Sequence, residues 1–111
     1  MDEYNIIVTN HALRAFAEIK DYIAIELVNP SAAVNHMQLF RSEIKKLAEN
    51  PSRFKLIDEQ PWHDEGVRKI RVKNYCIYYW IDEETHTVYV TDALYVGRDQ
   101  PRWLKEMPKK Q

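Results

Sequence analysis

The sequence predicts one α+β domain, a two-layer sandwich with elements in the order β-α-α-β-β-β. Two stretches in the first half space their apolar residues in steps of three and four, as amphipathic helices do. Three later stretches are rich in β-branched and aromatic residues, which favours strands joined as an antiparallel meander. A helical hairpin must bury its apolar stripe, and one face of the sheet is the surface available for it. The chain has 111 residues, of which 45% are hydrophobic, so we expect a single domain over 1–111.

The chain is expected to open with a short strand over Tyr4–Val8 and to continue into a helix over Ala12–Val28. Thr9 suits the N-cap of this helix, because its hydroxyl can accept a hydrogen bond from a free amide of the first turn. Asn29-Pro30 is expected to end the helix, because the residue before proline is pushed out of the α region. Its buried face would comprise Leu13, Phe16, Ile19, Ile23 and Leu27.

A second helix is predicted over Ala32–Glu49, with Ser31 as its cap and Asn50-Pro51 at its end. The loop between the two helices is short, so the helices should lie antiparallel. The apolar face of the second helix would comprise Ala33, Met37, Phe40, Ile44 and Leu47.

The polar stretch Ser52–Glu65 contains Pro61 and no periodicity, so we expect a loop with little regular structure, followed by the meander. Lys73-Asn74 has the length and composition of a hairpin turn. From about residue 100 the chain should be an irregular tail. The expected strands are Val67–Val72, Tyr75–Ile81 and Thr87–Val96.

Several classes of site find little support in the sequence. The four histidines have no metal-ligand spacing, and the two glycines form no phosphate-binding loop, so we expect no metal and no cofactor. Cys76 alternates with Tyr78 and Trp80 on one strand face, which favours a buried residue over a nucleophile, and Trp62 and Trp103 are expected to cover the edges of the core. A single cysteine and the lack of a signal or membrane segment predict a cytoplasmic protein.

Positive charge gathers locally, although the net charge is only −1. On the first strand of the meander, Lys69, Arg71 and Lys73 should project to one face, with Arg68 beside them. A second basic group lies near the end of the chain. Together the two groups would form an anion-binding groove, or they would simply keep a strand face solvated. The second group comprises Arg98, Arg102, Lys105, Lys109 and Lys110.

Arg98 stands between Gly97 and Asp99, directly after the last predicted strand. A glycine there can permit a bend or bulge that directs the arginine into the groove. The alternative is that Arg98 and Asp99 only hold a loop in place.

The segment Gly66-Val-Arg-Lys-Ile-Arg-Val-Lys-Asn-Tyr-Cys-Ile-Tyr-Tyr79 resembles the RelE/ParE superfamily of toxins. The resemblance continues through Val88-Tyr-Val-Thr-Asp-Ala-Leu-Tyr-Val-Gly-Arg-Asp99 and covers roughly residues 4 to 104. It implies the toxin of a type II toxin–antitoxin module of the plasmid-stabilisation type, which arrests growth when free. The implied partner is a cognate antitoxin, with no membrane and no small-molecule cofactor involved. An acidic or amphipathic antitoxin segment would cover the groove beside Lys69, Arg71 and Arg98.

Two activities occur in this superfamily. A RelE-like toxin would be a metal-independent endoribonuclease that cuts mRNA on the ribosome, and the resemblance then implies catalytic roles for Lys69, Arg71 and Arg98. Arg68, Lys73 and Arg102 would contact the partner or the nucleic acid.

A ParE-like toxin would inhibit DNA gyrase. This chain carries Cys76 where many RelE-like enzymes have an arginine, and Trp103-Leu104 where they have a terminal tyrosine. We therefore favour the ParE-like activity, which leaves open whether the protein is an enzyme. A third reading is a non-toxic member that acts only as co-repressor with its antitoxin.

Overall fold

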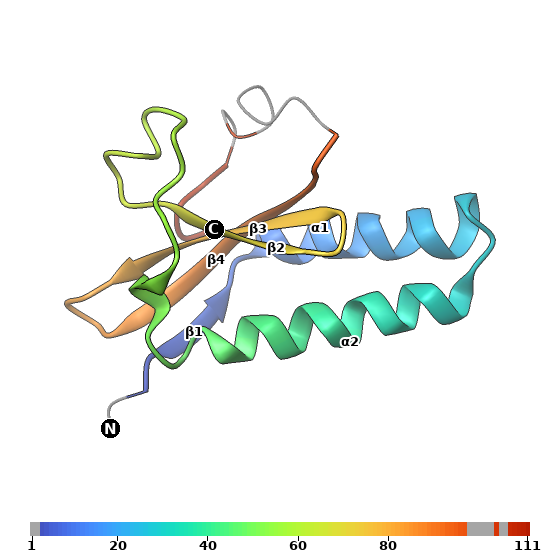
Figure 1. Ribbon diagram of the computed structural model, residues 1–111, viewed down its shortest axis with the longest axis horizontal. Helices are drawn as coiled ribbons and strands as arrows, with labels where there is room; N and C mark the ends of the chain where they lie inside the picture. Colours follow the sequence, from blue (N-terminus) through green and yellow to red (C-terminus); the bar gives the residue numbers. More distant parts are fainter. Residues whose placement is uncertain (1–2, 98–103, 105–106) are drawn as a thin grey trace.

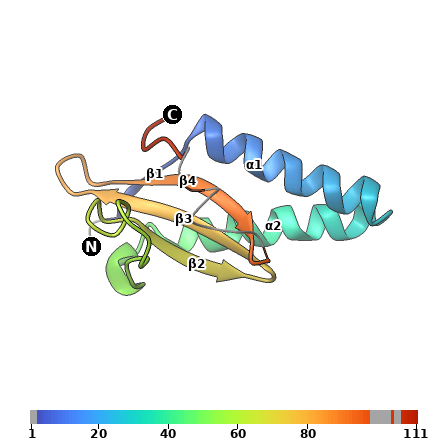
Figure 2. The same cartoon turned by 90° about the horizontal axis from the view of Figure 1, so that it is seen from above.

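The computed structural model describes residues 3–97, 104 and 107–111 and confirms the α+β class (Figure 1). A helical hairpin covers one face of a four-stranded sheet, and the turn that joins the helices lies beyond the ends of the strands in both views (Figure 2). The elements are β1 (Asn5–Val8), α1 (Asn10–Asp21), the π-helical turn η1 (Tyr22–Glu26), α2 (Pro30–Lys46), the 3-10 turn η2 (Pro51–Arg53), β2 (Arg68–Val72), β3 (Tyr75–Asp82) and β4 (Thr87–Tyr95).

The strands follow the order β1-β4-β3-β2. β2, β3 and β4 form the predicted antiparallel meander, and Lys73-Asn74 is its two-residue turn. β1 pairs with β4 in parallel, from Asn5 opposite Thr87 to Val8 opposite Val90. The sheet is therefore mixed, which corrects the expectation of a wholly antiparallel sheet. A parallel neighbour requires a long connection, and the helices and the first two meander strands provide it.

The helix ends are set by local capping. The Thr9 hydroxyl accepts a hydrogen bond from the Ala12 amide at 3.2 Å, as expected. The cap of α2 is Asn29, whose side chain accepts from the Ala32 amide at 3.1 Å, and the expected cap Ser31 lies inside the helix. Pro30 fits the first helical position because the amide that it lacks would have no intrahelical partner there.

The main core lies between the helical hairpin and the sheet. The four side chains expected to be buried together, Phe16, Ile23, Phe40 and Ile44, are all in it. The Phe40 ring lies 5.4 Å from that of Phe16 and 5.6 Å from that of Tyr75, measured between centroids. The paired apolar stripes thus pack against each other as predicted, except that Leu13 and Leu27, expected on the buried face of the first helix, are about half exposed.

A second apolar cluster covers the opposite face of the sheet. The segment between η2 and β2 and the C-terminal residues supply its outer layer, and Trp62 is buried there as expected. The predicted loop has one isolated bridge, between Leu56 and Arg68. Trp103 lies outside the described residues. The cluster comprises Ile57, Trp62, Val67, Cys76, Tyr78, Trp80, Leu94, Leu104 and Met107.

Within the described residues, no helix combines the length and the apolar character that a bilayer crossing requires.

Candidate functional site

Lys69 and Arg71 of β2 lie on the sheet face that points away from the helices, whereas Arg68 lies in the row of Ile70 and Val72, on the other face. Lys69 stands opposite Tyr78 and Arg71 opposite Cys76, whereas Ile70 and Val72 belong to the main core. The alternation predicted for this strand is therefore confirmed. Cys76 itself is buried, with only 3% of its surface exposed.

Two cations of this group bond to backbone carbonyls of the chain. Arg68 donates from Nη1 to the carbonyl oxygens of Ser52, at 3.3 Å, and of Phe54. Arg71 donates from Nε to the carbonyl oxygen of Lys73, at 3.0 Å, beside the hairpin turn. Arg68 thus links β2 to η2 and to the residue that follows η2. It has a structural role in addition to the binding role expected of it.

The C-terminal lysines lie at another place on the same face. Lys109 Nζ lies 4.4 Å from the centre of the Trp80 ring, and the Lys110 ammonium is 3.8 Å from a carboxylate oxygen of Asp82. Trp80 is four residues beyond Cys76 on β3, roughly 13 Å at 3.3 Å per residue. These two lysines do not gather with Arg71 into one groove.

The remaining basic candidates, Arg98, Arg102 and Lys105, lie outside the described residues. Gly97 is described, and a Cβ atom there would lie only 2.5 Å from the Tyr95 ring. A side chain at position 97 would therefore collide with the Tyr95 ring in its present position.

A cleft of about 780 Å³ lies between the helical hairpin and the end of β4. β1 ends at Val8, opposite Val90, so among the described residues β4 has β3 as its only neighbour beyond that point. Ile19, Ile23, Leu27 and Ala93 contribute apolar surface to the cleft. Tyr22, Leu27 and Tyr95 also line it and are each about half exposed. The cleft therefore has an apolar wall that solvent can reach.

The wide turn η1 shapes one end of this cleft. The Leu27 amide donates to the carbonyl oxygen of Tyr22 at 3.2 Å, five residues back instead of four. Such π-helical turns are rare in proteins, and those that occur are often found at functional sites. Here the turn brings Tyr22 and Leu27 to the cleft and leaves Ile25 and Val28 exposed.

A carboxylate–histidine pair also lines the cleft. Oδ2 of Asp92 lies 3.2 Å from Nε2 of His11, and Oδ1 accepts a hydrogen bond from the Ala93 amide at 2.8 Å. The Asp92 side chain is 3% exposed and that of His11 is 30% exposed. Burial raises the pKa of the Asp92 carboxyl, an effect that the Ala93 amide and His11 partly offset and that the charge of Glu18 reinforces.

A β-bulge positions Asp92. Tyr79 pairs with Val90 and Tyr78 with Asp92, so Thr91 is an extra residue in β4. Strict alternation from Val90 would place Asp92 in the main core, but Ala93 lies there instead. Sequence reasoning missed this site, and its one signal was the polar pair Thr91-Asp92 inside an otherwise apolar strand.

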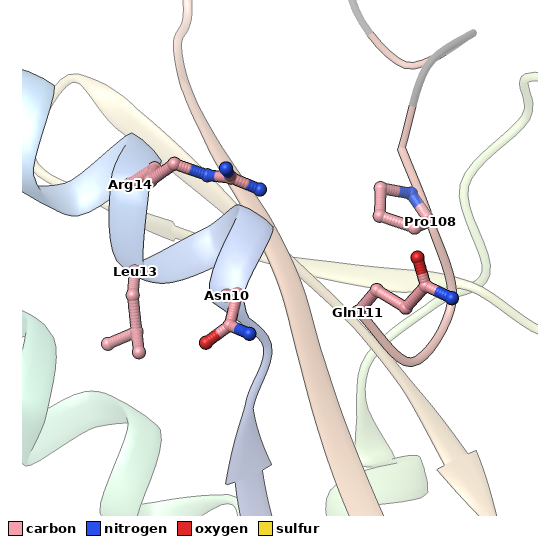
Figure 3. A pocket seen from close by; sticks show the side chains of 5 residues that line it. All are labelled: Asn10, Leu13, Arg14, Pro108 and Gln111. Atoms are coloured by element: carbon pink, nitrogen blue, oxygen red, sulfur yellow. The ribbon is translucent and has the colours of Figure 1, made fainter.

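A second hollow, of about 610 Å³, borders the first turns of α1 (Figure 3). Figure 3 shows Leu13 and Arg14 of α1 on one side of it and Pro108 and Gln111 of the C-terminal segment on the other. Arg14 lines both hollows. In the part of the chain that the structure describes, no three His, Cys, Asp or Glu side chains gather to hold a metal ion.

The fold is similar to those of solved toxins. The chromosomal ParDE system of P. aeruginosa matches with a TM-score of 0.69 and 15% identity, over 85% of this chain and 97% of that one. The RelBE2 toxin–antitoxin complex of Mycobacterium tuberculosis matches with a TM-score of 0.56 and 21% identity, over 86% and 93% of the two chains. A mutant of the E. coli toxin RelE in its free state matches with a TM-score of 0.62 and 14% identity, over 91% and 92%. These likenesses show the shared fold.

Sequence comparison is more specific. No protein of curated function matches the chain in sequence. The sequence profile of the ParE toxin of type II toxin–antitoxin systems, parDE, matches residues 6–99, which is most of the chain. The superfamily resemblance is thereby confirmed, and the chain belongs to the ParE toxin family of type II toxin–antitoxin systems.

Proposed function

We propose that this toxin inhibits DNA gyrase when it is free in the cytoplasm, and that a cognate antitoxin neutralises it. The observation that carries the choice of target is the burial of Cys76, at the position where the resemblance to RelE-like enzymes implies an arginine. A small buried thiol cannot present positive charge to a phosphate. One missing cation in a site of this kind commonly costs about 10²–10³ in rate.

Two further features support a target other than ribosomal mRNA. Leu104 is fully buried at the position where those enzymes have a terminal tyrosine, so that proton-transfer group is missing as well. Its loss costs roughly another 10²–10⁴ in rate. Arg68 could replace the missing cation only by giving up its bonds to Ser52 and Phe54.

The test of the target expresses the chain without its partner. Inhibition of gyrase predicts filamentous cells, trapped gyrase cleavage complexes and intact mRNA, and the purified chain should block supercoiling by gyrase. Codon-phased mRNA cuts within ribosomes that disappear in Arg71→Ala and Arg98→Ala would instead establish a RelE-like endoribonuclease. Normal growth on expression would support the third reading, a co-repressor without toxicity.

The antitoxin partner is inferred from the family and from two of the similar structures, which are toxin–antitoxin systems. We infer that a segment of the antitoxin fills the cleft between α1 and β4. The sequence led us to expect this contact beside Lys69, Arg71 and Arg98. The cleft is favoured because it is hollow and offers apolar surface, which supplies most of the driving force for association.

The partner assignment is tested by co-purification with the product of the adjacent reading frame at moderate salt. Leu27→Gln, on the exposed edge of the cleft, should weaken the complex. Val34→Gln is a matched control, because Val34 is about half exposed on α2 and does not line the cleft. Failure of the wild-type chain to form any complex would contradict the partnership. Equal weakening by both variants would contradict the location.

A further inference from the structure

We propose that Asp92, together with His11, binds one basic side chain of the segment that fills the cleft. The occupant is then an amphipathic segment of the antitoxin that carries an arginine or lysine among apolar residues. This inference rests on the proposed antitoxin partnership and adds to it the chemistry by which the partner is recognised.

The carboxylate of Asp92 has unused capacity to accept hydrogen bonds. An ionised carboxylate offers about four acceptor positions. In the free chain Oδ1 receives the Ala93 amide and Oδ2 lies against His11 Nε2. A guanidinium or ammonium group that enters the cleft can therefore bond to Asp92 without breaking either contact.

Among the described residues that line the cleft, two are acidic, Asp92 and Glu18, against one arginine, Arg14, so the balance of charge favours a cation. α1 contributes His11, Arg14 and Glu18, α2 contributes His36, and β3 and β4 contribute Tyr75 and Asp92. His36 Nδ1 lies 2.8 Å from the carbonyl oxygen of Ala32, within its own helix.

Asp92 and Glu18 are close enough for the charge of Glu18 to raise the pKa of the Asp92 carboxyl, and burial raises it further. His11 is the one cation-forming side chain within hydrogen-bonding distance of Asp92 among the described residues. A positive charge from the partner would offset both the burial of Asp92 and its repulsion from Glu18.

The walls of the cleft define the rest of the occupant. Apolar surface from Ile19, Ile23 and Leu27 runs along one helix and its π-helical turn, so apolar side chains of the partner can pack there. The half-exposed Tyr95 ring lines the same cleft as Asp92. Arginine suits this setting best, because its planar group can bond to a carboxylate and stack on an aromatic ring at the same time.

The test measures the Kd between the purified chain and the product of the adjacent reading frame by calorimetry. Asp92→Asn keeps the shape of the side chain and removes its charge, so Kd should rise about 10- to 100-fold. Glu18→Gln, at an exposed position, should raise Kd only about 2- to 5-fold. Asp58→Asn is the control, since Asp58 is exposed and lies outside the cleft, and its Kd should equal that of the wild type.

A double-mutant cycle identifies the basic group of the partner. Each arginine and lysine of the antitoxin is replaced in turn by glutamine and measured against the wild type and Asp92→Asn. One of these replacements should weaken binding of the antitoxin to the wild-type chain. The same replacement should not weaken its binding to the Asp92→Asn chain any further. Thermal melting of free Asp92→Asn should show a folded chain, which separates loss of recognition from loss of structure.

Three results would decide against the inference. If Asp92→Asn binds as tightly as the wild type while Leu27→Gln binds weakly, the antitoxin fills the cleft without using Asp92. If every replacement of a basic residue in the antitoxin weakens binding by the same factor with the wild type and with Asp92→Asn, the contact does not exist. If the wild-type chain binds nothing, the partnership itself is wrong and this inference fails with it.

Discussion

Nε2 of His11 lies 3.2 Å from Oδ2 of Asp92, a contact between residues 81 positions apart that joins the first turn of α1 to β4. The neighbouring Thr9 reinforces it, because its hydroxyl donates to the carbonyl oxygen of Thr91 at 3.5 Å. The start of α1 is thereby attached to the bulge of β4. This junction places a buried carboxylate in a cleft that also offers apolar surface.

The raised pKa of Asp92 makes stability depend on pH. The folded state holds this proton more tightly than the unfolded state, whose carboxyl has a pKa of about 3.9. Asp92 therefore lowers the free energy of unfolding as the pH rises through the interval between the two pKa values. Urea unfolding from pH 3 to 7 should show Asp92→Asn gaining stability relative to the wild type as the pH rises.

Asp58→Asn is the control for this prediction, because the same substitution there changes an exposed carboxyl. A difference between Asp92→Asn and the wild type that stays constant across this pH range would contradict it.

Phe40→Ala should destabilise the fold severely. The Phe40 side chain is 2% exposed and lies against both Phe16 and Tyr75, so truncation opens a cavity between the hairpin and the sheet. The free energy of unfolding should fall by about 3–5 kcal/mol in urea denaturation. Val34→Ala, on the exposed side of the same helix, should change it by no more than about 0.5 kcal/mol. A loss below about 1 kcal/mol at Phe40 would refute the packing described.

Arg68 and Arg71 should differ although they lie on the same strand. Arg68→Ala leaves the carbonyl oxygens of Ser52 and Phe54 without their donor and should cost about 1–3 kcal/mol of stability. Arg71 is exposed, and Arg71→Ala should stay within about 0.5 kcal/mol of the wild type. Chemical denaturation of both variants checks this, and equal losses would show that Arg68 has no special structural role.

Tyr79→Phe should remove a buried hydrogen bond and also the part of the pH dependence of stability that Tyr79 causes in the alkaline range. The Tyr79 hydroxyl donates to the carbonyl oxygen of Pro51 at 2.6 Å, so its loss should cost about 1–3 kcal/mol. Burial raises the pKa of Tyr79 to about 12, although Arg68 and Arg53 oppose the rise. The unfolded state therefore loses this proton first, and the contribution of Tyr79 to stability falls as the pH rises from about 10 to about 12.

Denaturation at pH 8 and across the alkaline range measures both effects. Tyr22→Phe is the control, because Tyr22 is about half exposed. A Tyr79→Phe variant as stable as the wild type at pH 8 would count against the bond.

The sequence by itself determined the order of the helices and strands and most of the residues that they bury. Local periodicity carries this information, because a side chain three or four positions along a helix, or two along a strand, must point the same way. Phe16 and Phe40 on the helices, and Ile70 and Val72 on β2, were placed correctly for that reason. The ordered motifs on this frame were also enough to indicate the toxin superfamily, which the ParE family match confirms.

Only the tertiary structure decided how distant segments meet. The parallel pairing of β1 with β4 brings residues 82 positions apart into register, from Asn5 opposite Thr87 onward, and no local pattern encodes that partner. The extra residue Thr91 shifts the alternation of β4 and takes Asp92 out of the helix-facing row, where periodicity alone would put it. His11 and Asp92 meet because β1 holds the start of α1 beside β4. The cleft and its buried carboxylate therefore depend on contacts between segments far apart in the chain, which periodicity cannot predict.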